Sequence, residues 1–440
     1  MQWCCQAVCV VGLVLLSACT HTPPVGPPLP LTTPATVYGA EVLLEDSARL
    51  AQLRGKRLAV VANATSRVYD RTHLVDTLLA LGLSLERVFA PEHGFRGDQE
   101  AGDTVQSGRD PRTGLPVVSL YGETKKPTPE SLAGIDVVLF DIQDVGARFY
   151  TYLSTLALVQ EACAEAGVAL WVLDRPNPNG HTVAGPVLVP GWASFVGAHP
   201  IPIVHGLTLG EYARLLNGER WLAGGVQAQL TVVPLRHWWH GRHWEATHRR
   251  WVPPSPNLPT PTAARLYPAL CWFEGTQVSL GRGTALPFRQ TGYPGFRAPQ
   301  VPGTHAPQVF VPQSQPGAAL RPLHEALPCT GVYWLGPGFD TEASFKASLA
   351  LLAEAYRQYP PFEAQFSAAA GYPKPFFNPF KSANPWFEKL TGGPAVRQAI
   401  EAGLPPDSLW AQWAPGVAAF KTLRAPYLLY PEMAPNKPPT

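Results

Sequence analysis

The sequence lacks the short motifs that mark nucleotide-dependent and zinc-dependent proteins. No GxGxxG follows the first predicted strand, no GxxxxGK[ST] phosphate loop occurs, and no CxxC or zinc-spaced His/Cys cluster is present. The GxSxG nucleophile motif of α/β-hydrolases is also missing. A formal net charge of +2, without a dense run of Lys or Arg, argues against a nucleic-acid partner. We therefore expect no cofactor and no structural metal.

Cysteine is scarce in the part of the chain that is expected to fold. Of the 7 cysteines, only Cys163, Cys271 and Cys329 lie beyond Cys19. An odd number of widely spaced cysteines is not a disulfide framework, so we expect at most one bridge. Only 15% of the residues are charged and 46% are hydrophobic, a composition typical of a folded globular protein.

The first residues indicate export. Residues 1–18 form an apolar run that ends in Leu16-Ser17-Ala18-Cys19, which is typical of a secretory signal. These last four residues resemble the lipobox of bacterial lipoproteins, which implies cleavage before Cys19 and lipidation of its thiol. An uncleaved signal or a plain membrane anchor is the alternative. We expect the protein on the periplasmic face of the cell envelope, and Thr20 after the cysteine favours the outer membrane. Residues 19–38 are rich in Pro and Thr and predict an extended tether.

Residues 39–206 alternate short apolar runs with helical stretches. Val/Leu/Ile runs that are separated by helices predict a Rossmann-like parallel sheet covered on both faces, and thus an α/β fold. Residues 207–440, with many Pro-rich loops, predict a second, smaller α/β domain, with an active cleft between the two. The predicted strands of the first domain are 57–63, 87–91, 116–120, 136–142 and 169–173, and LTVVPL at 230–235 predicts a strand in the second. The predicted helices include 72–82, 129–133, 151–167, 208–217, 345–356 and 393–402.

Each of the five predicted strands of the first domain runs into polar, chemically capable residues. Ligands of open parallel sheets bind beyond the carboxyl ends of the strands, so these residues predict one converging polar site. Several carboxylates in such a place favour an enzyme. The residues are Asn63, Glu92 with His93, Tyr121, Asp141 with Asp144 and Arg148, and Asp174 with Arg175 and Asn177.

The strongest of these segments is Glu92-His93-Gly94-Phe95-Arg96-Gly97. A carboxylate beside a His at a strand end can supply general acid/base catalysis, and the glycines allow a sharp turn. The alternative is a loop acid that pairs with Arg96.

Two further strand ends allow both a functional and a structural interpretation. Asp141 and Asp144 are close enough in sequence to raise one another's pKa, although one of them can instead cap the following helix. The Arg175 guanidinium is suited to bind a substrate carboxylate, and the alternative is an Asp174–Arg175 clamp within the loop.

The second half of the chain adds fewer candidates. Glu274 and Arg282 either belong to the site or form an ion pair between loops, and His205 precedes a predicted helix. Asn257 lies in a Pro-rich loop. The His/Trp cluster at 237–244 is expected to be an exposed loop and not a metal site.

Ordered motifs along the mature chain resemble the exo-β-N-acetylmuramidases, a glycoside hydrolase family formerly classed as a domain of unknown function, DUF1343. The resemblance extends from about residue 42 to residue 430. The motifs are FAPEHGFRG, TGLPVVSLYG, VLFDIQDVGARFYTYLST, VLDRPNPNG, PIPIVHGLTLGE, PPSPNLPT, EGTQVSLGRGT and YLLYPE.

This resemblance implies release of terminal N-acetylmuramic acid from the non-reducing end of peptidoglycan fragments, in a cleft between a Rossmann-like and a smaller domain. It places the catalytic glutamate on Glu92, with His93 expected to orient it. The second carboxylate is Glu274, Asp174 or Asp141, which assists an oxocarbenium-like centre or orients the 2-acetamido group. Arg148, Arg175 or Arg282 is expected to bind the lactyl carboxylate in bidentate fashion. The expected substrate-binding residues are Asn63, Arg96, Tyr121, Asp144, Arg148, Arg175, Asn177, His205, Asn257 and Arg282.

Two other functions fit parts of the pattern. A non-catalytic muropeptide-binding lipoprotein would use the same crevice, but it would not need acids at several strand ends. A metal-dependent amidase or deacetylase would use Asp141, Asp144 and His93 together.

Overall fold

The computed structural model describes residues 33–96, 107–336, 341–370, 376–377 and 385–434. The chain divides into two units, Met1–Pro34 and Ala35–Thr440, and every element below belongs to the second. The predicted signal at 1–18, Cys19 and most of the predicted tether lie outside the described residues. Within the described ranges, no helix is both long and apolar enough to cross a membrane.

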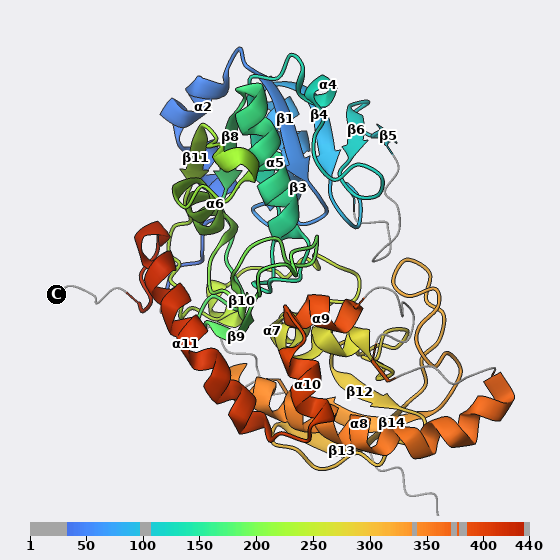
Figure 1. The fold of residues 1–440 in the computed structure, drawn as a ribbon. Helices are drawn as coiled ribbons and strands as arrows, with labels where there is room; N and C mark the ends of the chain where they lie inside the picture. The colour runs from blue at the N-terminus through green and yellow to red at the C-terminus, as the bar shows by residue number, and fades with distance from the viewer. Residues whose placement is uncertain (1–32, 97–106, 337–340, 371–375, 378–384, 435–440) are drawn as a thin grey trace, which may run out of the picture. The chain divides into compact units, whose positions relative to one another are not determined.

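A seven-stranded sheet confirms the predicted Rossmann-like layer. Its order is β11-β8-β7-β1-β4-β6-β5, and every neighbouring pair except β5–β6 is parallel (Figure 1). Strand β11 and helix α6 come from beyond residue 206, where the sequence predicts a second domain. The strands are β1 (Arg57–Ala62), β4 (Ser84–Ala90), β5 (Gly108–Arg109), β6 (Pro116–Ser119), β7 (Val137–Asp141), β8 (Ala169–Leu173) and β11 (Leu230–Val233).

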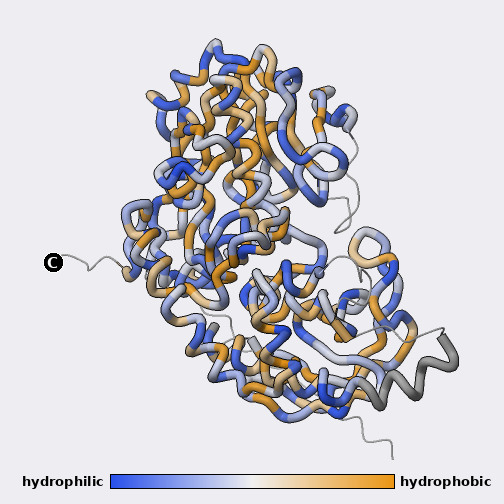
Figure 2. Tube along the Cα trace, in the orientation of Figure 1, coloured by the Kyte–Doolittle hydropathy of each residue, from blue (hydrophilic) through white to orange (hydrophobic). Residues whose placement is uncertain are grey.

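The central strands of this sheet are buried on both faces, because their alternate residues enter different cores. Val61 and Phe140 pack in one hydrophobic cluster with α5 and α6, whereas Val60 and Leu139 pack in another with α1 and α3. Strands β1 and β7 are correspondingly apolar over most of their length (Figure 2). The helices of this layer are α1 (Gly39–Glu45), α2 (Ser47–Leu53), α3 (Leu74–Ala80), α4 (Pro129–Leu132), α5 (Tyr152–Ala166) and α6 (Leu209–Gly218), and β2 (Arg67–Val68) pairs with β3 (Thr72–His73).

The remaining chain builds a smaller α/β assembly. Strands β12 (Gln290–Tyr293), β14 (Cys329–Trp334) and β13 (Thr304–Phe310) form an antiparallel sheet in that order, and β9 (Ala184–Val187) pairs with β10 (Pro202–Val204). Its interior includes the fully buried Trp272 and Trp334. The helices are α7 (Pro261–Leu270), α8 (Thr341–Ala370), α9 (Trp386–Thr391), α10 (Ala395–Glu401) and α11 (Pro406–Arg424).

The C-terminal segment around Leu429 and Tyr430 packs against the parallel sheet layer. The Tyr430 hydroxyl donates to Asp174 Oδ2 at 2.6 Å, and the Leu429 amide donates to Glu211 Oε1 at 2.8 Å. Tyr430 packs with Trp238 and Trp244 in a separate core. The prediction of an exposed His/Trp loop at 237–244 is therefore wrong for these tryptophans, because the C-terminal segment covers them.

Candidate active site

A cavity of about 600 Å³ opens beyond the carboxyl ends of β4 and β6. This volume is in the range of small-molecule sites. Glu92, His93 and Tyr121 reach it from strand-end loops of the parallel sheet, and Glu274 and Arg282 reach it from the second half of the chain. These five predicted site residues, which are distant in sequence, therefore share one cavity.

A left-handed turn presents Glu92 and His93 to the cavity. His93 has φ +71° and Gly94 has φ +76°, a conformation that His tolerates and that glycine adopts without a steric cost. The Gly94 amide closes the turn on the Pro91 carbonyl at 3.0 Å. The chain thus reverses directly after β4, and the half-buried Glu92 stands at the cavity wall.

The first turn of helix α5 holds the Glu92 carboxylate. Thr151 occupies the N-cap position but makes no side-chain bond to its own helix, because its hydroxyl donates to Glu92 Oε2 at 2.6 Å. Tyr152 OH lies 3.3 Å from the Glu92 carbonyl and accepts from Asn63 Nδ2 at 2.8 Å. Asn63 does not line the cavity, so its predicted contact with substrate is corrected to a supporting contact with Tyr152.

The second carboxylate of the cavity is Glu274, in the short 3-10 helix η3 (Cys271–Gly275). Arg282 Nη2 contacts Glu274 Oε1 at 2.5 Å, so the predicted ion pair exists and both of its members line the cavity. Burial, followed by the negative charges of Glu274 and Glu92, raises the pKa of the Cys271 thiol well above its usual range. Both carboxylates are therefore close enough to Cys271 for their charges to affect its pKa.

Aromatic rings form much of the remaining wall. Tyr267 lies 5.6 Å from Tyr150 and 5.0 Å from Phe288 between ring centroids, in edge arrangements. Such rings offer apolar faces for a sugar. Several lining residues were not predicted from the sequence, although Phe149, Tyr150, Thr151 and Ser279 lie within the motifs that carry the family resemblance. The others include Tyr267, Arg321 and Trp386. Ser255, from the motif PPSPNLPT, also lines the cavity.

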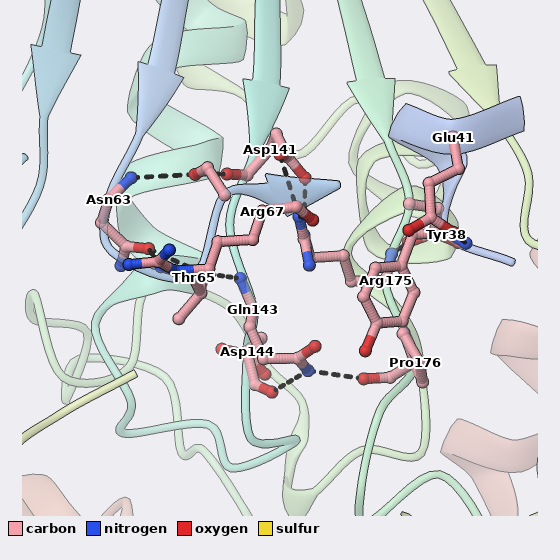
Figure 3. A network of polar contacts seen from close by, with 12 residues as sticks. Tyr38, Glu41, Asn63, Thr65, Arg67, Asp141, Gln143, Asp144, Arg175 and Pro176 are labelled. Atoms are coloured by element: carbon pink, nitrogen blue, oxygen red, sulfur yellow. Dashed lines mark hydrogen bonds and ion pairs between the residues drawn. The ribbon is translucent and has the colours of Figure 1, made fainter. Parts of the chain in front are cut away.

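Asp141 and Arg175 form a buried structural pair (Figure 3). Arg175 donates from Nε and Nη2 to the two Asp141 oxygens at 2.5 and 3.0 Å, and Asp141 is 0% exposed. Because β7 lies two strands from β4 in the sheet, the two strands are about 10 Å apart. Neither residue lines the cavity, so the catalytic role predicted for Asp141 and the binding role predicted for Arg175 are corrected.

The Asp174 carboxylate binds the N-terminus of helix α6, whose N-cap residue is Thr208, and is not placed as a catalytic acid. Its carboxylate accepts from the Gly210 amide at 2.9 Å, from the Thr208 hydroxyl at 2.7 Å and from the Tyr430 hydroxyl at 2.6 Å. Burial raises the pKa of Asp174 to about 6. With its oxygens committed to α6 and to the C-terminal segment, Asp174 is closed to a substrate, and the predicted role is corrected.

Asp144 is also enclosed. It accepts from the Gly146 amide at 2.6 Å, and burial raises its pKa to about 7 without help from a neighbouring carboxylate. Helix α5 begins at Tyr152, so Asp144 does not cap it. The predicted contact of Asp144 with substrate is corrected, because the side chain is buried away from the cavity.

The two terminal nitrogens of Arg148 are committed to backbone carbonyls. It donates to Pro186 O at 2.7 Å, to Ile201 O at 2.9 Å and to Leu390 O at 3.0 Å. Burial lowers the pKa of Arg148 to about 9. The guanidinium ties the β9–β10 region to the end of α9, so its predicted role in binding a substrate carboxylate is corrected.

The other predicted binding residues also make structural contacts outside the cavity. Arg96 pairs with Asp110 at 2.7 Å and not with Glu92, and burial lowers the pKa of His205 to about 3. The contacts are Arg96 with Asp76 and Asp110, Asn177 with Leu207 O, His205 with the Leu207 amide, and Asn257 with Ala318 O.

The described residues contain no group of three or more His, Cys, Asp or Glu side chains arranged to hold a metal ion. Cys163, Cys271 and Cys329 are buried free thiols.

The chain is similar to proteins of known family along almost its full length. The family description "Exo-beta-N-acetylmuramidase NamZ, N-terminal" matches residues 58–262, and its C-terminal counterpart matches residues 265–430. A Bacillus subtilis protein described as peptidoglycan beta-N-acetylmuramidase NamZ is 37% identical over 406 residues, which cover 90% of this chain and 92% of that protein.

Two crystal structures of Bacteroides fragilis DUF1343 family proteins share the fold. One is 39% identical with a TM-score of 0.74, and the other is 31% identical with a TM-score of 0.75. Each comparison covers 90% of this chain and 99% of the solved chain. The family predicted from the motifs is thereby confirmed: the chain belongs to the NamZ family of exo-β-N-acetylmuramidases.

Proposed function

We propose that this protein is an exo-acting glycoside hydrolase that releases terminal N-acetylmuramic acid from the non-reducing end of peptidoglycan fragments. The observation that carries the proposal is one aromatic-lined cavity that holds two carboxylates, Glu92 and Glu274, in a chain of this family. Glycosidic cleavage needs an acid for the leaving oxygen and a second group that assists the oxocarbenium-like centre.

The contacts of the two acids suggest different roles. Glu92 is the proposed acid or acid/base, because Thr151 fixes one carboxylate oxygen and the turn at His93 fixes the backbone. Glu274 is the proposed second group, oriented by Arg282. It either stabilises the positive charge at the anomeric carbon or orients the 2-acetamido group of the substrate. His93 lines the same cavity and is the proposed orienter of Glu92.

The geometry does not favour the amidase or deacetylase alternative. That alternative requires Asp141, Asp144 and His93 to meet, whereas only His93 lines the cavity. Asp141 is enclosed by Arg175, and Asp144 is enclosed by its own loop.

A pair of isomeric disaccharides tests the proposal. We expect the protein to cleave β-linked N-acetylmuramyl-N-acetylglucosamine and to leave N-acetylglucosaminyl-N-acetylmuramic acid intact, because only the first has muramic acid at its non-reducing end. Mass spectrometry of the products distinguishes the two. Cleavage of both, or of only the second, would contradict the proposed specificity.

We also propose that the mature protein is lipid-anchored through Cys19 at the periplasmic face of the outer membrane. The support is the apolar run 1–18, the Leu-Ser-Ala-Cys sequence and Thr20. We expect Cys19→Ala to move the protein from the membrane pellet to the soluble fraction, as measured by immunoblotting after ultracentrifugation. Membrane retention of the variant would argue against a lipid anchor at this residue.

A further inference from the structure

The substrate class proposed above carries a lactyl carboxylate, which needs a cationic partner. The arginines that the sequence suggests for this role already have partners within the protein. Arg148 donates to three carbonyls, Arg175 pairs with Asp141, and Arg282 pairs with Glu274. A different cation is therefore needed if the anion is recognised by a charge.

Arg321 is a cation of this kind. It lines the cavity and is exposed. Within the described part of the chain, its guanidinium has no carboxylate partner, in contrast to Arg282. Arg321 is thus available for a charge that enters from solution.

The loop that carries Arg321 is anchored at several points. Asn257 Nδ2 donates to the Ala318 carbonyl at 2.7 Å, and a two-way backbone pair at 2.8 Å joins Gln315 and Ala319. Three residues after Arg321, His324 Nε2 contacts the Gln277 carbonyl at 2.7 Å. Asn257, a predicted binding residue, thus contributes by holding this loop.

Glycine at position 283 brings the loops of Arg282 and Arg321 together. Gly283 has φ +79°, and a Cβ atom there would lie 2.4 Å from Gln313 O and 2.7 Å from Pro322 Cγ. Any side chain would therefore push Pro322, the neighbour of Arg321, away from the Gly281-Arg282-Gly283 turn. This close approach explains why a residue without a side chain is needed at position 283. It also brings the two loops together, so that Arg282 and Arg321 line the same cavity.

We infer that Arg321 binds the lactyl carboxylate of the terminal N-acetylmuramic acid and selects this sugar over N-acetylglucosamine. The inference rests on the proposed function. Arg282 orients Glu274, whereas Arg321 binds the lactyl group, which is present in N-acetylmuramic acid and absent from N-acetylglucosamine. A guanidinium suits this task because its planar fork matches a carboxylate with two parallel hydrogen bonds.

A substrate whose lactyl group is uncharged distinguishes carboxylate recognition by Arg321 from a role in catalysis. Two chromogenic β-N-acetylmuramides are compared, one with the free lactyl acid and one with the lactyl primary amide, which keeps the shape but not the charge. We expect the wild-type protein to favour the acid in kcat/KM by about 10- to 100-fold, the range of a charge-assisted hydrogen bond. Arg321→Gln should remove most of this preference by slowing hydrolysis of the acid, and Arg321→Lys should keep part of it.

The matched control is Arg297→Gln, at an exposed arginine that does not line the cavity. This variant should keep the wild-type preference. An unchanged preference in Arg321→Gln would overturn the inference, as would an equal loss on both substrates. If the wild-type protein cleaves neither muramide, the proposed function itself fails, and that outcome differs from the first two.

Discussion

Replacing Glu92 with Gln is expected to lower kcat on a chromogenic β-N-acetylmuramide by about 10²- to 10⁴-fold, the usual contribution of a general acid/base. Gln keeps the shape of the side chain and can still accept from the Thr151 hydroxyl, but it cannot transfer a proton to the leaving oxygen. Steady-state release of the chromophore measures the effect. Circular dichroism and the thermal midpoint check that the variant is folded.

The control for this experiment is Glu123→Gln, at an exposed glutamate that does not line the cavity. It should retain wild-type turnover. Full activity of the Glu92→Gln variant would remove this residue from the mechanism, even if the substrate specificity is as proposed. A variant that loses both turnover and its fold would instead show that Glu92 supports the structure.

The second large effect concerns stability. We expect Asp141→Asn to lower the free energy of unfolding by about 3 to 5 kcal/mol, because it leaves the Arg175 charge buried and uncompensated. Urea denaturation followed by fluorescence measures the change. Turnover per folded molecule should stay close to that of the wild-type protein, since Asp141 does not line the cavity.

Asp136→Asn is the control for this second experiment, because the Asp136 carboxylate pairs with Arg57 at the protein surface, where solvent screens the interaction. It should leave the denaturation midpoint nearly unchanged. If Asp141→Asn remains as stable as the wild-type protein but loses turnover, the structural role that we assign to the Asp141–Arg175 pair is wrong.

Strand β8 and helix α5 show which parts of the fold local sequence can predict. The predicted strand 169–173 coincides with β8, and the predicted helix 151–167 ends at Gly167, which has φ +67° beyond α5. Both segments have an unbroken apolar pattern and a clear boundary residue. The antiparallel strand β13 was not predicted, because its segment contains Pro307, which argues against a strand in a sequence pattern.

The site divides in the same way. The principle that polar residues gather beyond strand ends identified Glu92, His93 and Tyr121, which do line the cavity. It failed for Asp141 and Asp174, which lie at ends of strands farther along the same sheet edge. Ligands bind somewhere along the edge formed by the carboxyl ends of the strands, but one sugar occupies only part of this edge. Polar residues at the ends of the other strands are therefore free to take structural roles.

The sequence alone determined the α/β class and the family, and it identified Glu92 as the candidate catalytic acid, because apolar periodicity and contiguous motifs are local properties of the chain. The tertiary structure decided which acids share a cavity. Sheet order separates β7 and β8 from β4, and Asp141 and Asp174 found partners in Arg175 and in the cap of α6. It also decided the place of Arg321, whose loop reaches the cavity through contacts with Gly283 and Asn257 that no local pattern predicts.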